Sequence, residues 1–193
     1  ATEAKYMRAE ARFLRAQAYY HALDLFGNVP FVLDTDPAGT LPKRIVRADL
    51  FKFVESELKA LETELKDPKT NEYGRADKAA AWTLLSRLYL NAKVYSGSER
   101  NNDVITYANK VIGAGYALKK QTIQVPDPDN PGQTKPKDIS YESLFLADNH
   151  LNNPEVILSV NYDGIKTQTW GGTTFLVHAS VGGEMNAADF GIN

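Results

Sequence analysis

The stretch DLFKFVESELKALETELK, residues 49–66, has the clearest periodicity in the chain. Its apolar residues recur every three or four positions, at Leu50, Val54, Leu58, Leu61 and Leu65. The charged residues between them are Lys52, Glu55, Lys59, Glu62 and Lys66. On an α-helix these two sets lie on opposite faces. The stretch therefore predicts a helix with one face on a core and the other in solvent. Asp49 is its expected N-cap, and Glu55–Lys59 and Glu62–Lys66 are expected ion pairs.

Three more helices are predicted, over residues 3–26, 77–95 and 103–113. In the first, two apolar rows run side by side, and we expect both to contribute to the core: Leu14, Ala18, Ala22 and Leu25, and Phe13, Ala16, Tyr20 and Leu23. The third helix has Asp77 as its expected N-cap and is apolar around much of its circumference, which suggests neighbours on two sides. Val104, Ala108, Val111 and Ile112 give the last helix its apolar face.

Short connections join the last three helices, and the helix predicted over 77–95 has three consecutive small residues, Ala79, Ala80 and Ala81. Small side chains let helices approach closely, as in tetratricopeptide-like pairs. The predicted fold class is mainly α, with tetratricopeptide-like antiparallel helix pairs over residues 1–118. Residues 119–193 are expected to form a loop-rich part with short strands. Within it, 121–138 reads as an exposed Pro-rich loop, and 156–162 and 173–177 as strands.

Composition narrows the functional classes. Hydrophobic residues make up 43% of the 193 positions and charged residues 24%, as in an ordinary globular domain. Because 22 Lys and Arg nearly balance 24 Asp and Glu, no basic field favours nucleic acid as a partner. The absence of cysteine excludes disulfides and thiolate zinc sites. The sequence shows neither a membrane-spanning apolar run nor a signal peptide, so any export signal or lipid anchor is expected outside this stretch, which we interpret as a piece of a longer protein.

Catalytic motifs are missing from the sequence. His21, His150 and His178 have no metal-ligand spacing, and His21 is expected to be packed in the core. The carboxylates lie mainly on helix faces expected to be solvated, so no general acid–base pair stands out. The acidic stretch 127–132 has Pro131 where a calcium loop needs an oxygen ligand, and it reads as a stiff polar loop. We therefore expect no enzyme.

Trp170 lies in a polar, Gly-rich context without apolar periodicity: Thr167, Gln168 and Thr169 precede it, and Gly171 and Gly172 follow. A large ring on such a loop is unfavourable unless it covers something. Two interpretations stay open. The indole either caps the helical core or offers a stacking face to a flat apolar ligand surface, such as that of a sugar ring.

Several stretches together resemble SusD/RagB-type outer-membrane nutrient-binding lipoproteins. They are AEARFLRAQAYY (9–20), LFGNVPFV (25–32), GRADKAAAWTLLSRLYL (74–90), YANKVIGAGY (107–116), YESLF (141–145) and NPEVILSV (153–160). Matching blocks in one order are more specific than a single motif. The segment from residue 147 to residue 172 is most similar to the starch-binding branch of the family.

This resemblance implies a stack of tetratricopeptide-like helix pairs with a less regular ligand-binding part, here residues 119–193. It implies a surface-exposed lipoprotein of the outer membrane that captures oligosaccharide, here starch or malto-oligosaccharide, without cleaving it. Its implied partner is a SusC-type TonB-dependent transporter. Trp170, Tyr162 and Gln168 are the implied ligand-binding residues. Some family members hold a calcium ion, for which Asp148 is the candidate ligand here.

Two other functions remain as alternatives. A tetratricopeptide-like scaffold for protein–protein contacts, without a small-molecule site, would account for the helices alone. A glycoside hydrolase would need two carboxylates facing each other at roughly 5–10 Å across a cleft. The sequence nominates no such pair.

Overall fold

The computed structural model describes residues 2–146, 149–161 and 166. The chain divides into two compact units, Ala1–Ser159 and Val160–Asn193, and the helices and strands below all belong to the first. The helices are α1 (Thr2–Phe26), α2 (Arg47–Leu61), α3 (Lys78–Leu90), α4 (Ala92–Ser96) and α5 (Asn101–Gly113). Two antiparallel hairpins pair β1 (Val29–Phe31) with β2 (Lys43–Ile45) and β3 (Thr122–Pro126) with β4 (Thr134–Asp138). A 3₁₀ turn covers Glu142–Phe145.

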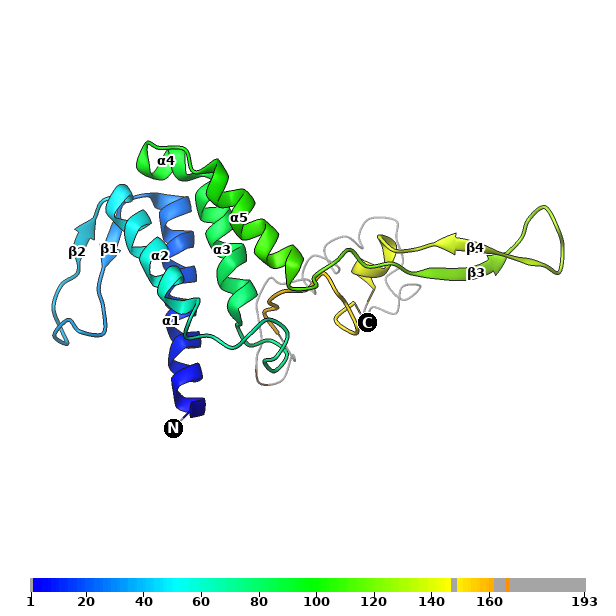
Figure 1. Ribbon diagram of the computed structural model, residues 1–193, viewed down its shortest axis with the longest axis horizontal. Coiled ribbons are helices and arrows are strands. Elements are labelled where there is room, and N and C mark those ends of the chain that lie inside the picture. Colours follow the sequence, from blue (N-terminus) through cyan, green and yellow to red (C-terminus); the bar gives the residue numbers. More distant parts are fainter. Residues whose placement is uncertain (1, 147–148, 162–165, 167–193) are drawn as a thin grey trace, which may run out of the picture. The chain divides into compact units, whose positions relative to one another are not determined.

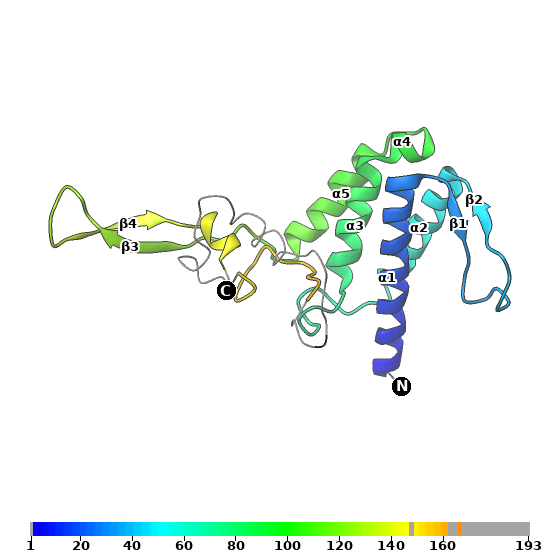
Figure 2. The same cartoon turned by 180° about the vertical axis from the view of Figure 1, so that it is seen from behind.

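The long helices alternate in direction (Figures 1 and 2). α2 packs against α1 and α3, and α3 packs against α5. The chain thus forms successive antiparallel helix pairs, and the predicted mainly helical class is confirmed.

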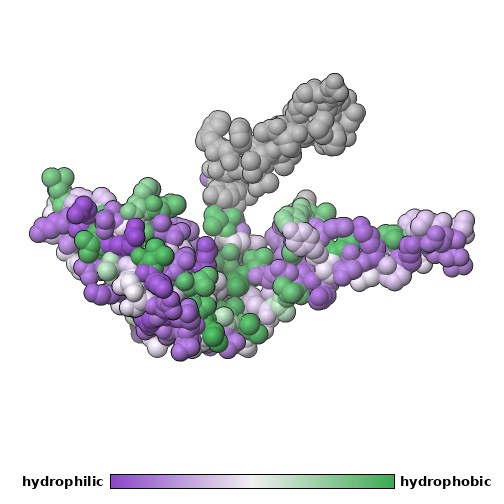
Figure 3. Space-filling model, turned by 90° about the horizontal axis from the view of Figure 1, so that it is seen from above, coloured by the Kyte–Doolittle hydropathy of each residue, from purple (hydrophilic) through white to green (hydrophobic). Residues whose placement is uncertain are grey.

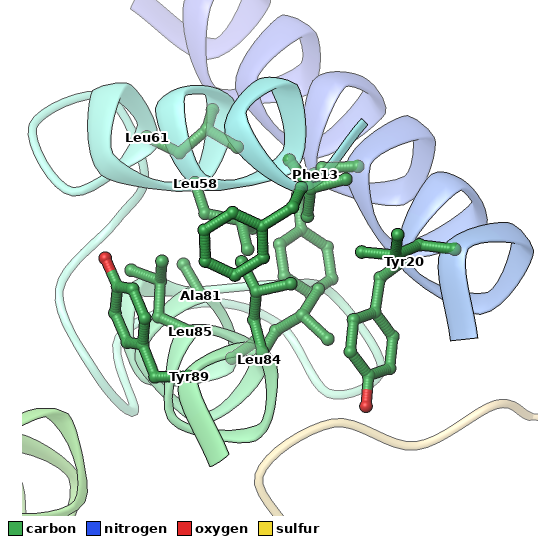
Figure 4. Packing of buried hydrophobic residues seen from close by; sticks show 14 of the residues in the cluster. Phe13, Tyr20, Leu58, Leu61, Ala81, Leu84, Leu85 and Tyr89 are labelled. Carbon is green, nitrogen blue, oxygen red and sulfur yellow. The ribbon is translucent and has the colours of Figure 1, made fainter. Parts of the chain in front are cut away.

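The core lies between α1, α2 and α3, where side chains from all three helices point toward one another (Figure 4). The face predicted from residues 49–66 is buried as expected, with Val54, Leu58 and Leu61 fully inaccessible to solvent. Leu85, Leu88 and Tyr89 of α3 are also fully buried. The core therefore depends on apolar residues recurring at helical spacing.

A side-chain cap is present at the start of α3. Asp77 caps α3 as predicted, accepting hydrogen bonds from the backbone N–H groups of Ala79 and Ala80 at 2.8 and 3.1 Å. The predicted cap Asp49 is wrong, because α2 already begins at Arg47. Asn28 accounts for the earlier start: its Oδ1 accepts a hydrogen bond from the Arg47 N–H at 2.9 Å, which satisfies one of the helix's free donors.

Two helices end earlier than predicted. α2 ends at Leu61 and not at residue 66. Hydrogen-bonded turns follow it, and Leu65 at their end is buried. The helix predicted over 77–95 breaks at Asn91, whose backbone leaves the helical region and whose side chain donates to the Tyr95 hydroxyl. Asn favours such local hydrogen bonds over helix continuation. The break lets α4 place Ala92 and Tyr95 in the core.

The burial of α1 differs from the sequence expectation. Only the row Phe13, Ala16, Tyr20 and Leu23 is buried, together with Ala9. In the other predicted row, Leu14, Ala18 and Leu25 are exposed and Ala22 is partly buried. His21 was expected in the core, but it is exposed beside the ring of Tyr20. The two rows lie on opposite faces of the helix and not side by side, and in the described structure only one of them meets a neighbour.

α5 shows a similar difference. Tyr107 is its buried residue, Val104 packs at the edge of the core, and Ile112 is 67% exposed.

The segment predicted as an exposed loop, 121–138, is exposed but forms the β3–β4 hairpin. Its turn is held by Asp127, whose carboxylate accepts hydrogen bonds from the Asp129 N–H and Asn130 Nδ2 and pairs with Lys135. The predicted strand over 156–162 is wrong for residues 156–161, which form no strand. There Ile157 and Leu158 pack against the helical core, so their apolar character reflects packing. The strand predicted over 173–177 lies outside the described residues.

The surface is mixed. In Figure 3, hydrophobic residues lie among hydrophilic ones on the face of the molecule that is shown. Large exposed apolar residues include Leu14, Leu25, Phe26, Tyr141 and Phe145. Among the described helices, none combines the length and apolar character needed to cross a bilayer.

Candidate functional site

The residues that the resemblance implies for ligand binding, Trp170, Tyr162 and Gln168, lie outside the described residues, as does Asp148. They stay predictions. His150 is exposed. Within residues 2–146, 149–161 and 166, no cluster of His, Asp and Glu could hold a metal ion.

A cleft of about 460 Å³ is lined in part by residues between Asn152 and Ser159, which precede Tyr162 and Trp170 in the sequence. Its walls come from three places in the chain: the α2–α3 connection, Tyr116 after α5, and residues 152–159. The connection contributes Lys69 and the run from Asn71 to Arg75. The cleft therefore lies between the helical region and the segment that precedes the predicted ligand-binding residues in the sequence.

Asp77 organises the cleft floor. Its side chain is buried and accepts four hydrogen bonds, two from the N-terminus of α3, one from the Lys69 N–H at 2.9 Å and one from the Tyr116 hydroxyl at 3.3 Å. Lys69 has a positive φ of 62°, a conformation that non-glycine residues adopt uncommonly. One carboxylate therefore joins the start of α3 to both side walls.

We expect Asp77→Ala to lower the free energy of unfolding by about 1–2 kcal/mol, the cost of losing a strong N-cap. Asp77→Asn is the matched variant, since an Asn Oδ1 still caps α3 while its Nδ2 cannot accept from the Lys69 N–H. Chemical denaturation of both variants measures the effect. An Asp77→Ala variant as stable as the parent chain would remove Asp77 from this role.

The two tyrosines of the cleft differ in availability. Tyr116 is half-buried; burial, together with the charge and hydrogen bond of Asp77, raises its pKa to about 12. Lys69 Nζ lies 4.6 Å from its ring centroid and also donates to the Gly115 carbonyl. Tyr73 is 57% exposed. Of the two rings, Tyr73 is therefore the one open to a flat apolar ligand face.

Arg75 fixes the α2–α3 connection to α1. Its guanidinium pairs with Glu10 at 2.9 Å and Glu3 at 2.8 Å, and Asn71 Nδ2 donates to Glu10 and to the Ala76 carbonyl. The connection is thus held at both ends, by α1 and by Asp77. A fixed loop carrying an exposed aromatic ring and amide groups suits recognition of a polar ligand.

The acids in the cleft do not form a catalytic pair. Glu72 has a 79% exposed side chain beside Arg75, and Asp77 is occupied by its four hydrogen bonds. Hydrolysis of a glycosidic bond needs one carboxyl group free to donate a proton and a second free to act as base or nucleophile. In the described part of the cleft Asp77 is not free for either role, so Glu72 lacks the second carboxyl group that the reaction needs.

The carboxylates expected on a solvated face of α2 are partly buried instead. Glu62 accepts hydrogen bonds from Trp82 Nε1 at 3.0 Å, the Tyr107 hydroxyl at 2.7 Å and Lys110 Nζ at 2.6 Å. Glu62 thus pairs with Lys110 and not with its predicted partner Lys66, which pairs with Glu3.

Glu55 keeps its predicted pair with Lys59 at 3.2 Å, and it also contacts the Tyr89 hydroxyl at 2.7 Å and Arg100 at 3.1 Å. Glu57 joins Arg12 and Arg15 of α1. These three acids therefore tie α2 to its neighbours on both sides.

The pKa values of Glu55, Glu57 and Glu62 all lie below the ordinary value of 4.5. Burial acts to raise each pKa. The hydrogen bonds and charges from Tyr, Lys and Arg act to lower it, and together they outweigh the effect of burial. Because the folded pKa is depressed, their contribution to stability is present above the unfolded pKa and is lost as pH falls through the folded value. We expect unfolding free energy to decrease as pH falls below about 4.5.

Glu62→Gln tests this dependence. The variant is expected to be less stable than the parent at pH 7, and the difference should shrink below about pH 4.5, where the parent carboxylate becomes protonated. Glu99→Gln is the control, since Glu99 is 57% exposed and pairs only with Lys93 among the described contacts. Denaturant titrations at several pH values measure both. A pH-independent difference for Glu62→Gln would contradict the expectation.

A second hollow, of about 640 Å³, lies between α1 and the end of α2. Its lining includes Lys5, Arg8 and Arg12, but Arg12 is bound to Glu57 and Glu64. It is separate from the segment that leads to the predicted ligand-binding residues.

Comparison with known proteins identifies relatives. No family model matches the chain. The starch-binding protein SusD of Bacteroides thetaiotaomicron is 39% identical over 173 residues, which cover 88% of this chain and 28% of SusD. The chain therefore spans less than a third of that relative's length.

Two solved structures from Bacteroides fragilis also match. A SusD-like protein aligns with 84% of this chain and 28% of its own, with a TM-score of 0.61 and 27% identity. A SusD-like carbohydrate-binding protein aligns with 62% of this chain and 23% of its own, with a TM-score of 0.49 and 28% identity. The extended identity to SusD and the matching helical arrangement of the first structure agree with the blocks recognised in sequence. This chain belongs to the SusD family.

Proposed function

We propose that this chain is part of a surface-exposed outer-membrane lipoprotein that binds starch or malto-oligosaccharides and delivers them to a SusC-type TonB-dependent transporter. The observation that carries the proposal is the 39% identity to a starch-binding protein over 88% of the chain. In this proposal residues 119–193 form the ligand-binding region, and the helical region 1–118 supports it.

Trp170, with Tyr162 and Gln168, is the proposed ligand contact. A pyranose ring has an apolar C–H face that an aromatic ring desolvates, while neighbouring polar groups bind the hydroxyls. The residues around Trp170 supply such groups, with Thr167, Gln168 and Thr169 before it. The sequence pattern thus fits a sugar-stacking loop.

Binding is proposed to occur without cleavage. In the described part of the chain, the partly buried acids are each held by basic or hydroxyl groups, as at Glu55, Glu57 and Glu62. A carboxylate that is needed for such contacts is a poor proton donor for a leaving group. The proposal therefore assigns capture and not turnover.

A binding screen of the full-length protein against a polysaccharide panel tests the proposal. We expect retention by starch and amylopectin and none by an unrelated β-linked glucan, with no reducing sugar released. Binding to a different glycan alone would overturn the starch assignment. Absence of binding to any glycan would favour the scaffold alternative, and starch hydrolysis that one carboxylate substitution abolishes would favour an enzyme.

A further inference from the structure

Two side chains that line the cleft of about 460 Å³ are free to contact a ligand. Tyr73 belongs to the α2–α3 connection and Asn152 to the wall formed by residues 152–159, and both are exposed. Among the contacts between described residues, the Tyr73 hydroxyl and the Asn152 amide have no hydrogen-bond partner. The cleft therefore has one unoccupied polar side chain on each of two walls, and one of them carries an aromatic ring.

Both of these walls are held in place by the protein itself. The α2–α3 connection is fixed to α1 and to the start of α3. In the opposite wall, the Asn153 side chain donates to the Asn149 carbonyl at 2.9 Å and accepts from the Glu155 N–H at 3.0 Å. The Glu155 carboxylate accepts from the Lys119 N–H at 2.8 Å, which ties this wall to the chain after α5. Walls that are fixed before binding lose less conformational freedom when a ligand enters.

The charged groups of the cleft are already paired, which favours an uncharged ligand. The lining holds two cations and two anions, whose formal charges cancel: Lys69, Arg75, Glu72 and Asp77. Lys69 Nζ donates to the Gly115 carbonyl, and Arg75 pairs with acids of α1 and with Glu72 at 3.6 Å. Asp77 is filled by its four hydrogen bonds. A charged ligand would have to displace one of these contacts, whereas a neutral polar ligand would not.

We propose that this cleft is a second glycan-binding site, built from residues other than Trp170, in which a pyranose ring stacks on Tyr73. The proposal rests on the proposed function, because it takes the same class of ligand. Sugar hydroxyls donate and accept hydrogen bonds, as do the Tyr73 hydroxyl and the Asn152 amide. The partly buried Pro154 and Val156 add apolar contact along one wall. A volume of about 460 Å³ is within the usual range of small-molecule sites.

Calorimetric titration of the full-length protein with maltoheptaose tests this site. We expect Tyr73→Ala to weaken binding by about fivefold to thirtyfold, the scale of truncating an aromatic contact. Tyr73→Phe keeps the stacking ring and is expected to retain most of the affinity. Phe26→Ala is the control, because Phe26 is a 71% exposed ring on α1 that does not line the cleft. Its affinity is expected to match that of the parent protein.

The possible results separate the failure of this site from the failure of the proposed function. If the parent protein binds maltoheptaose and Tyr73→Ala binds equally well, the cleft is not a glycan site, while glycan binding by the protein stands. A loss for Tyr73→Phe as large as that for Tyr73→Ala, or an equal loss for Phe26→Ala, would also overturn stacking on Tyr73. No binding by the folded parent protein would remove both the site and the proposed function.

Hydroxyl-radical footprinting of the parent protein locates the ligand without a substitution, and it decides the question even if Tyr73→Ala fails to fold. We expect saturating maltoheptaose to slow oxidation of Tyr73 by about threefold or more, because a stacked sugar covers the face of the ring. Oxidation of Phe26 is expected to proceed at the same rate with and without glycan. An unchanged rate at Tyr73 under saturating glycan would overturn the proposal.

Discussion

Leu88→Ala is expected to lower the free energy of unfolding by about 2–5 kcal/mol. Leu88 lies on α3 and is fully buried in the hydrophobic core, to which α1 and α2 also contribute. Truncation removes its transfer free energy and leaves a cavity that close-packed neighbours fill only in part. Denaturant unfolding monitored by circular dichroism measures the change.

The matched control is Leu90→Ala, two residues away on the same helix. Leu90 is 65% exposed, so the same truncation removes little buried area. We expect its effect to stay within about 0.5 kcal/mol, as for ordinary surface substitutions. Similar losses for both variants would contradict the assignment of the inner and outer faces of α3.

Trp170→Ala is expected to weaken oligosaccharide binding by the full-length protein by about 1–3 kcal/mol, the scale of truncating an aromatic hot spot. The loss follows from removal of the surface on which a pyranose ring stacks. Melting temperature should change little, because a ring that serves ligand contributes little to the core. Affinity and melting are measured on the same variant.

The alternative interpretation of Trp170 makes the opposite forecast. An indole that caps the helical core would cost about 3–5 kcal/mol of stability when truncated. Unchanged affinity together with a large drop in melting temperature would therefore remove Trp170 from the proposed site.

Much of the helical fold could be predicted because α2 and α3 bury apolar residues at a regular spacing. The faces of Leu58 and Leu88 were predictable from local sequence alone. The start of α2 was not, because its capping oxygen comes from Asn28, which is distant in sequence. A hydrogen-bond acceptor supplied from outside the helix leaves no local signal, and Asp49 was the nearest acid in the expected position.

The environments of charged residues were the least predictable. Glu55 and Glu62 have the spacing of a solvated face, yet they accept hydrogen bonds from Tyr89 and Tyr107 of the following helices. Periodicity says which side of a helix is polar, but not which partner meets that side. The tyrosines of the facing helices, Tyr89 and Tyr107, were the available signal.

The cleft shows the same limit. Asp77 was predicted as a helix cap, but its contacts with Lys69 and Tyr116 depend on how the chain returns after α5. Tyr73 carried no sequence signal beyond its residue type. For Trp170, the sequence offers only its polar neighbours and the family resemblance, and the prediction rests on those.

The central claim is tested most directly by titrating the full-length protein with a linear malto-oligosaccharide in a calorimeter, while the sample is assayed for new reducing ends. The account predicts saturable binding, no products, and weaker binding after Trp170→Ala. No heat of binding with malto-oligosaccharide or starch, under conditions where the protein is folded, would contradict it.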